Sequence, residues 1–222
     1  MEEFTVMKVV LIHTSPVSLN DLKALFKEII PEVEMVNIID DSLLEEVKRN
    51  GKINSDIISR MCVYVQVANT LHPDLIFNQC SSVGEAFDIA RNQVSCKTLK
   101  IDEPMAEKAV ELGSRIGVVA TVASTVQPSC DLIRRTADKM GKDVHVREYL
   151  VDGALDILMA GDTQKHNELV IEEIRKAASE NDVVVLAQGS MTAILPYLEG
   201  IEKPVLTSPR LAVERVKKEL GL

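Results

Sequence analysis

The sequence predicts an α/β protein made of two pseudo-symmetric lobes, each a mostly parallel β-sheet flanked by helices. Two observations lead to this prediction. Short apolar runs alternate with helical patterns along the 222 residues, as in parallel sheets covered by helices on both faces. The second half of the chain also repeats the strands and turns of the first half in the same order. An apolar content of 46% and a charged content of 27% suit a globular protein with a sizeable core.

The first half opens with a near-continuous apolar run, Val6–Ile12, of the kind found in strands buried on both faces. Turn residues then separate the following segments: Pro31 stops the first helix, Asn50-Gly51 forms a turn, and His72-Pro73 ends a long helix. In order, we expect strands at 6–12, 33–39, 75–77 and 95–101, and helices at 21–30, 43–49, 55–71 and 85–92.

The second half follows the same alternation. Asp102-Glu103-Pro104 places proline in the first turn of a helix, and Pro128 and Pro209 are interpreted in the same way. Gly141 ends the helix that starts at Pro128, and Gln188-Gly189-Ser190 forms a turn after a buried strand. In order, we expect helices at 102–112, 128–140, 163–181 and 209–220, and strands at 115–120, 144–150, 183–187 and 205–207.

An internal repeat supports the division into two lobes. Three segments of the first half recur 105 to 108 residues later: Val10–Thr14 as Gly117–Thr121, Asp74–Ser82 as Asp182–Ser190, and Asp102–Pro104 as Thr207–Pro209. Three matches in one order at nearly one spacing indicate a duplicated βα lobe. We expect a first lobe at 1–99, with the C-terminal helix 208–222 packing back on it, and a second lobe at 100–207.

The repeat also predicts where a ligand binds. Open α/β sheets bind ligands beyond the carboxyl ends of their strands, so two lobes facing each other through those ends would enclose one cleft. Hydroxyl side chains and helix N-terminal amides suit a carboxylate there, although serine and threonine are also common turn and cap residues. The candidate hydroxyl ligands are Thr14, Ser15, Ser81, Ser82, Thr121, Thr125 and Ser190.

Cys80 is the candidate reactive group. It follows the apolar run Leu75–Phe77, and a helical pattern begins shortly after it at Glu85. The N-terminal end of a helix favours negative charge, which would lower the pKa of the Cys80 thiol and favour the thiolate. The alternative is a small buried apolar residue, as most free cysteines are. Its counterpart in the second half, 108 residues later, is Gln188.

Composition excludes several classes of partner. The net charge of −9, the pI near 5.0 and the absence of a basic patch argue against nucleic acid. The four cysteines show no metal-ligand spacing, which predicts free thiols and no metal site. The acidic start Met1–Glu3 lacks the features of a signal peptide, and no apolar run is long enough to span a bilayer. We therefore expect a cytoplasmic protein with no membrane partner.

Several motifs together resemble one known superfamily. They are Cys80–Ser82 after a buried strand, the counterpart of that segment in the second half, Ile116–Thr121 and Ile101–Pro104. In order and spacing they resemble the aspartate/glutamate/hydantoin racemase superfamily, which includes arylmalonate decarboxylase and maleate isomerase. The resemblance implies a cofactor-independent isomerase with its active site in the inter-lobe cleft, acting at the α-carbon of a small carboxylate or amino acid. It also implies one catalytic cysteine from each lobe, and it is compatible with a homodimer.

Carried over residue by residue, the resemblance makes Cys80 the first catalytic cysteine. Ser81 and Ser82 match carboxylate ligands, Thr121 and Thr125 match hydroxyl ligands of the second lobe, and Gln188, followed by Gly189 and Ser190, takes the place of the second cysteine.

Gln188 is a serious departure, because an amide cannot act as an acid or base near neutral pH. It can still orient a carboxylate or stabilise an enediolate oxygen by hydrogen bonding. His13, at the end of the first strand, is a candidate second acid or base, although a lone histidine there is more often structural. Three functions remain open: a racemase or epimerase, a one-cysteine decarboxylase or isomerase, and a non-catalytic protein that binds a small acid.

Overall fold

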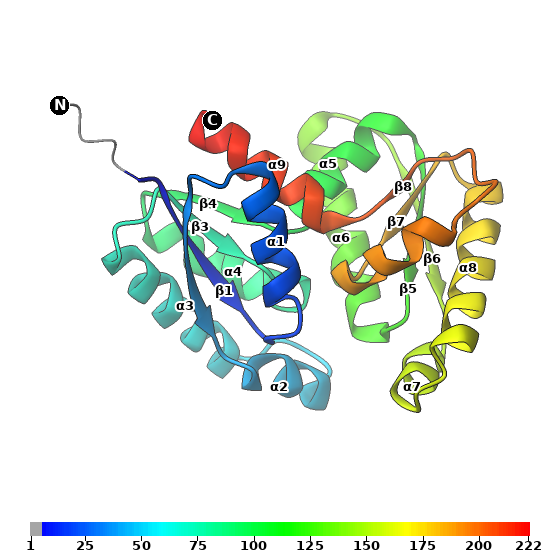
Figure 1. The fold of residues 1–222 in the computed structure, drawn as a ribbon, viewed down its shortest axis with the longest axis horizontal. Helices are drawn as coiled ribbons and strands as arrows, with labels where there is room; N and C mark the ends of the chain where they lie inside the picture. Colours follow the sequence, from blue (N-terminus) through cyan, green and yellow to red (C-terminus); the bar gives the residue numbers. More distant parts are fainter. Residues whose placement is uncertain (1–5) are drawn as a thin grey trace. The chain divides into compact units, whose positions relative to one another are not determined.

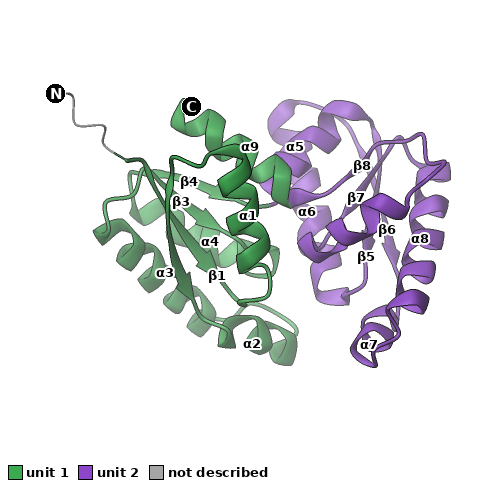
Figure 2. Ribbon diagram, in the orientation of Figure 1, with its two compact units in different colours: residues 1–101, 209–222 green, residues 102–208 purple. Residues whose placement is uncertain are grey.

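A computed structural model describes residues 6–222, so the acidic start Met1–Glu3 lies outside the described residues. The chain divides into two compact units, Met1–Ile101 with Pro209–Leu222, and Asp102–Ser208 (Figure 2). Within the described part, each unit contains a four-stranded sheet of parallel strands (Figure 1). The predicted α/β class and the two similar lobes are confirmed.

In unit 1 the strands lie in the order β2-β1-β3-β4. All neighbouring strands in this order are parallel, and the pairing of β1 with β3 passes over β2, so helical crossovers connect the strands, as parallel pairing requires. The elements of unit 1 are β1 (Lys8–His13), α1 (Leu19–Ile29), β2 (Glu34–Ile39), α2 (Ser42–Asn50), α3 (Ser55–Thr70), β3 (Leu75–Asn78), the 3-10 helix η1 (Ser81–Val83), α4 (Gly84–Ala90), the 3-10 helix η2 (Arg91–Gln93), β4 (Lys97–Lys100) and α9 (Ser208–Leu220).

Alternate residues of the central strands enter two separate apolar clusters, one on each face of the sheet. Val10 and Ile76 pack with α2, α3 and α4. Val9 and Leu75 pack with α1 and with α9, the helix that returns from the end of the chain. An ion pair between Arg210 of α9 and Glu28 of α1 lies over the second cluster. Helices therefore cover both faces of this sheet, which explains why its central strands β1 and β3 are nearly continuous apolar runs.

Unit 2 repeats this arrangement, with the strand order β6-β5-β7-β8. Helix α8 packs on β5 and β7 with the apolar cluster that contains Val170 and Ile174, and α5 and α6 also pack against these strands. The elements of unit 2 are α5 (Glu103–Leu112), β5 (Arg115–Ala120), α6 (Ala123–Met140), β6 (His145–Leu150), α7 (Ala154–Met159), α8 (Thr163–Glu180), β7 (Val183–Leu186), the 3-10 helix η3 (Gly189–Tyr197) and β8 (Val205–Leu206).

One pair of equivalent contacts shows the duplication at atomic detail. The Asp74 carboxylate accepts a hydrogen bond from the Lys8 backbone N–H at 2.7 Å, and the Asp182 carboxylate accepts one from the Arg115 N–H at 2.9 Å. Both aspartates stand just before the second central strand of their sheet and bind the start of the first. The repeat read from the sequence therefore corresponds to the same backbone arrangement in the two units.

Three segments of unit 2 differ from the expectations. Helix α6 begins at Ala123 rather than at Pro128, so Pro128 lies inside the helix. The short helix Ala154–Met159 was not expected, and the predicted turn at Gln188–Ser190 instead leads into the 3-10 helix Gly189–Tyr197. Pro128 favours a first helical turn, which placed the predicted start of α6 too late. The other two segments lack the apolar periodicity of a long α-helix, so the sequence pattern could not define them.

None of the helices in residues 6–222 combines the length and the apolar character needed to cross a membrane.

Candidate functional site

Cys80 lies two residues beyond the last residue of β3 and directly before η1, which continues into α4. The backbone at Cys80 is extended, with φ −122° and ψ 117°. The Asn78 side chain, at the end of the strand, donates a hydrogen bond of 2.9 Å to the Cys80 carbonyl oxygen. The turn is therefore held in place from within the strand, and Cys80 is at the strand end where the sequence predicts it.

The Cys80 thiol accepts hydrogen bonds from four donors. They are the Thr14 hydroxyl, the Ser82 hydroxyl and backbone N–H, and the Val83 N–H. Burial nevertheless outweighs them and raises the pKa of the Cys80 thiol above its ordinary value of 9.0. The expected lowered pKa is therefore wrong for the free protein, because the sequence could not reveal how strongly the surroundings of this partly buried residue disfavour the thiolate.

The other hydroxyl candidates of unit 1 divide into two groups. Thr14 and Ser82 are almost fully buried, with exposed fractions of 2% and 5%, and both contact the thiol. Ser15 lies one residue further along, where its hydroxyl oxygen accepts a hydrogen bond from the Val17 N–H at 3.3 Å. Ser81 is half-buried at the start of η1. Two of the four hydroxyls thus support the sulfur.

His13 ends β1 and is completely buried. Its Nε2 atom lies 2.9 Å from the Asn37 side-chain oxygen, and Gln79 provides a second hydrogen bond. Burial lowers the pKa of His13 despite these two bonds, which keeps the ring neutral at neutral pH. The Asn37 contact holds one side of the ring, while the buried Nδ1 atom has no hydrogen-bond partner among the described residues, so the role of His13 as a second acid or base stays a prediction.

Gln188 follows β7, and both ends of its amide are used within unit 2. Its side-chain oxygen accepts a hydrogen bond of 3.2 Å from the Thr121 N–H. Its side-chain nitrogen donates one of 2.8 Å to the Thr125 hydroxyl, which in turn donates to the Val122 carbonyl at 2.8 Å. Gln188 thus links the end of β7 to the end of β5 and to the first turn of α6.

Gly189 and Ser190 begin η3 directly after Gln188. The Ser190 side chain is exposed, and the Gln188 carbonyl accepts a hydrogen bond from the Met191 N–H at 3.0 Å. The structure therefore brings together two sets of predicted residues: Thr14, Ser82 and Cys80 in unit 1, and Thr121, Thr125 and Gln188 in unit 2. That the two sets line one cleft stays a prediction.

The other three cysteines are packing residues. Cys62 and Cys96 are half-buried against the apolar cluster of α2, α3 and α4. Cys130 of α6 is fully buried, and burial together with the neighbouring Glu148 carboxylate raises its pKa to about 12. All four cysteines of the chain lie in the described part and are free thiols.

Sequence reasoning missed one contributor to the Cys80 site, the Val83 N–H, because it is a backbone donor that no residue type reveals. It also missed a polar network around Arg60 at the end of β2, where the sequence pattern indicates only a turn at Asp40. Among residues 6–222, no group of three histidine, cysteine, aspartate or glutamate side chains is arranged to hold a metal ion.

Comparison with known proteins agrees with this architecture. A glutamate racemase from Bacillus anthracis superposes with a TM-score of 0.71 at 13% identity, over 97% of this chain and 82% of the racemase. An aspartate racemase from Picrophilus torridus gives a TM-score of 0.71 at 16% identity, over 97% and 94%. An allantoin racemase from Klebsiella pneumoniae gives 0.70 at 15% identity, over 97% and 88%. At these identities the likeness concerns the fold.

A sequence search of curated proteins finds no match. The family model described as Asp/Glu/Hydantoin racemase matches residues 19–216, most of the chain, including both β-sheet units from α1 onward. The predicted superfamily is confirmed: the chain belongs to the Asp/Glu/hydantoin racemase family.

Proposed function

We propose that this protein transfers a proton at the α-carbon of a small carboxylate or amino acid, without a cofactor, and that Cys80 is the group that carries the proton. The observation that supports this role is the set of four hydrogen-bond donors directed at the sulfur of the partly buried Cys80. A neutral thiol needs no such set of donors, whereas a thiolate in a buried site does.

The raised pKa indicates which way the proton moves first. At neutral pH the Cys80 side chain is a thiol, so the free protein holds a proton donor. When the thiol gives up its proton, the Thr14 hydroxyl, the Ser82 hydroxyl and the two backbone N–H groups stabilise the thiolate that remains. The site is therefore suited to deliver a proton to a carbanion or enediolate.

The substrate carboxylate would be held by neutral donors. In unit 1 we assign this role to Ser81 and Ser15, next to the residues that hold the sulfur. In unit 2 we assign it to the donors around Gln188, namely Thr121, Thr125, Gly189 and Ser190. Several neutral hydrogen bonds bind a carboxylate when the donors are fixed in place. The bonds from Gln188 hold Thr121 and Thr125 in place, and Thr125 would exchange its hydroxyl bond to the Val122 carbonyl for one to the substrate.

Gln188 favours a second candidate within the same family, a one-cysteine decarboxylase. Its amide has no titratable proton and is already bonded at both ends, so it supplies no second acid. Loss of CO₂ from a malonate-type diacid leaves the bonding electron pair on the α-carbon as an enediolate. Cys80 then donates its proton to that carbon, and the resulting thiolate regains a proton from water.

A panel of amino acids, small carboxylates and substituted malonates, incubated with the protein in D₂O, tests the proposal. We expect deuterium at the α-carbon of at least one compound, and CO₂ release as well if the substrate is a malonate. Ligand-dependent thermal stabilisation without exchange or CO₂ release from any compound would contradict the proposed chemistry and favour a non-catalytic small-acid binder.

A further inference from the structure

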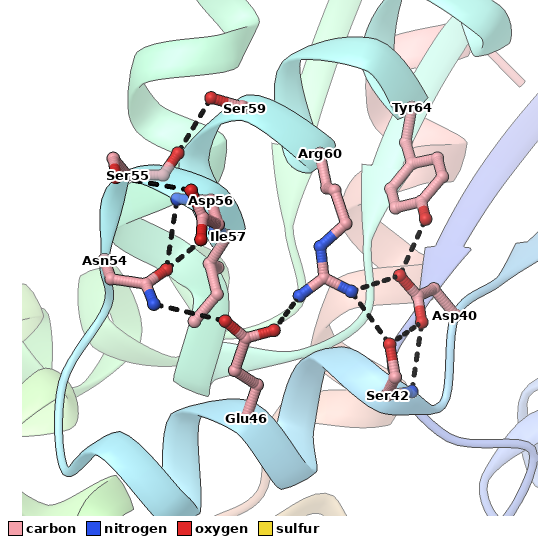
Figure 3. Close-up of polar contacts among 10 residues, drawn as sticks. All are labelled: Asp40, Ser42, Glu46, Asn54, Ser55, Asp56, Ile57, Ser59, Arg60 and Tyr64. Atoms are coloured by element: carbon pink, nitrogen blue, oxygen red, sulfur yellow. Dashed lines mark hydrogen bonds and ion pairs between the residues drawn. The ribbon is translucent and has the colours of Figure 1, made fainter.

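A network of polar side chains surrounds Arg60 of α3, close to where β2 ends and α2 begins (Figure 3). The guanidinium nitrogen Nη1 lies 3.1 Å from the Asp40 carboxylate and 2.8 Å from the Ser42 hydroxyl. The other nitrogen, Nη2, forms an ion pair with Glu46, one turn into α2. Arg60 thus binds both the start and the middle of α2 from a neighbouring helix.

The Asp40 carboxylate is held from several directions. It accepts hydrogen bonds from the Tyr64 hydroxyl at 2.6 Å, from the Ser42 hydroxyl at 2.6 Å and from the Ser42 N–H at 3.0 Å. Burial raises the pKa of Asp40, but these hydrogen bonds and the Arg60 charge outweigh it and hold the pKa below its ordinary value. Asp40 is therefore ionised at neutral pH and forms a fixed anchor for Arg60.

Glu46 is also held twice. Besides Arg60, it accepts a hydrogen bond of 3.1 Å from the Asn54 side-chain nitrogen, and the Asn54 side-chain oxygen caps α3 by accepting from the Asp56 and Ile57 N–H groups. The N-terminal part of α3 and two residues of α2, Ser42 and Glu46, therefore belong to one connected polar network (Figure 3). Isolated surface ion pairs contribute little, but a half-buried network with several partners for each charge fixes a geometry.

The opposite face of α2 connects this network to the thiol. Leu43 and Val47 of α2 are buried in the same apolar cluster as Val83 of η1, and Cys80 packs against that cluster. Helix α2 also contacts η1 directly. Ser82 and Val83 of η1 provide three of the four donors to the Cys80 sulfur. The position of α2 therefore affects both the burial of the thiol and the direction in which these hydrogen-bond donors point.

We propose that Arg60 is a positioning residue for Cys80: by binding Asp40, Ser42 and Glu46 it holds α2 against η1. The catalytic importance of this positioning rests on the proposed function. The effect of Arg60 on the burial and the hydrogen bonds of the Cys80 thiol can be measured without a substrate. In the intact protein, α2 shields the sulfur from water and keeps the η1 backbone in the conformation that donates to it.

The test compares Arg60→Met with Lys48→Met. Both substitutions remove one positive charge that pairs with an α2 carboxylate, but Lys48 is on the exposed face of α2 and, among residues 6–222, pairs only with Glu45 in an exposed ion pair. The rate of iodoacetamide labelling is measured for each cysteine by mass spectrometry. In Arg60→Met we expect the labelling rate of Cys80 to rise about tenfold, because local opening around α2 becomes easier. In Lys48→Met we expect the labelling rate of Cys80 to equal that of the unchanged protein.

Cys96 distinguishes positioning from general loosening, because it packs on the same apolar cluster as Cys80. We expect its labelling rate to stay unchanged in Arg60→Met. Glu46→Gln, a milder change that removes the charge of one Arg60 partner, should give a change in the same direction of about threefold. An unchanged Cys80 rate in both variants, or a parallel rise at Cys96, would overturn the inference.

The α-deuterium exchange assay gives an independent second measurement. If the unchanged protein shows no exchange with any compound, the proposed function fails, yet the labelling rates still decide whether Arg60 positions the thiol. If exchange is present, Arg60→Met should lower its kcat at least as much as its kcat/KM, because the variant disturbs the reacting group rather than the carboxylate ligands.

Discussion

The Cys80 sulfur experiences two opposing influences. Removal from water disfavours the thiolate, and the four hydrogen bonds from Thr14, Ser82 and Val83 favour it. The sum keeps the side chain protonated in the free protein, with donors already in place for the charged form. Such preorganisation lowers the energy of a charge that develops during a reaction, because no dipole needs to turn at that moment.

The first prediction concerns the Thr14 hydroxyl. Thr14→Val keeps the shape of the side chain but removes the hydrogen bond to the sulfur, so the pKa of Cys80 should rise further, because that bond favours the thiolate. The pH profile of Cys80 alkylation, measured between pH 7 and 11, should move to higher pH. Since thiolate is the reactive form, alkylation at a fixed pH below the pKa becomes slower.

Thr136→Val is the matched control, because the buried Thr136 hydroxyl bonds only to the Leu132 carbonyl within α6. Its alkylation profile at Cys80 should coincide with that of the unchanged protein. An unshifted profile in Thr14→Val would show that Thr14 does not support the sulfur.

At the scale of elements, strand β5 of unit 2 depends on a close approach at Gly117. A Cβ atom at this position would lie 2.8 Å from the Asn181 side-chain nitrogen and 3.1 Å from a ring carbon of Tyr149. Asn181 also donates to the Tyr149 hydroxyl at 2.8 Å, so neither neighbour is free to move away. Gly117 therefore allows the end of α8 to pack on β5, whose carboxyl end carries Thr121.

The second prediction is that Gly117→Ala lowers the free energy of unfolding by about 1–3 kcal/mol through overpacking. Gly84→Ala is the control, since Gly84 is in a helical conformation and its added Cβ would meet only Lys100 atoms at 3.6 and 3.8 Å. The free energy of unfolding of Gly84→Ala should be unchanged or higher by about 1 kcal/mol. Equal stability of Gly117→Ala and the unchanged protein in urea denaturation would disprove the steric argument.

The elements also show what sequence patterns can and cannot predict. The continuous apolar run Arg115–Ala120 was predicted with the bounds that the structure has. The start of α6 was missed because Pro128 favours a first turn, whereas here it is accommodated inside a longer helix. The pKa of Cys80 and the internal hydrogen bonds of Gln188 were also missed, since both depend on residues distant in sequence.

At the scale of the whole molecule, duplication gives each unit an equivalent strand end with a different chemical group. Unit 1 has Cys80 with its four donors, and unit 2 has Gln188 bonded to Thr121 and Thr125. The chain leaves unit 1 after Ile101 and returns to it at Pro209. If the ends of β3 and β7 act on one substrate, proton transfer is restricted to the face of the substrate that Cys80 contacts.

The third prediction follows from this asymmetry. Gln188→Cys supplies a second thiol that can give or take a proton, so an optically active substrate found in the D₂O panel should lose its optical activity. The unchanged protein should incorporate deuterium while optical rotation is retained. Gln188→Ser, which removes the amide without adding a thiol, is the control. Racemisation by Gln188→Ser at the same rate as by Gln188→Cys would contradict the assignment.

The most direct test of the central claim, that Cys80 carries the proton, compares the unchanged protein with Cys80→Ser. Mass spectrometry in D₂O measures α-deuterium in the substrate, and a thermal shift measures whether the substrate still binds. We predict that Cys80→Ser loses at least about 99% of the exchange rate, because a serine hydroxyl is far less acidic than a thiol, while the ligand-dependent thermal shift remains. Exchange by Cys80→Ser at the rate of the unchanged protein would contradict the account.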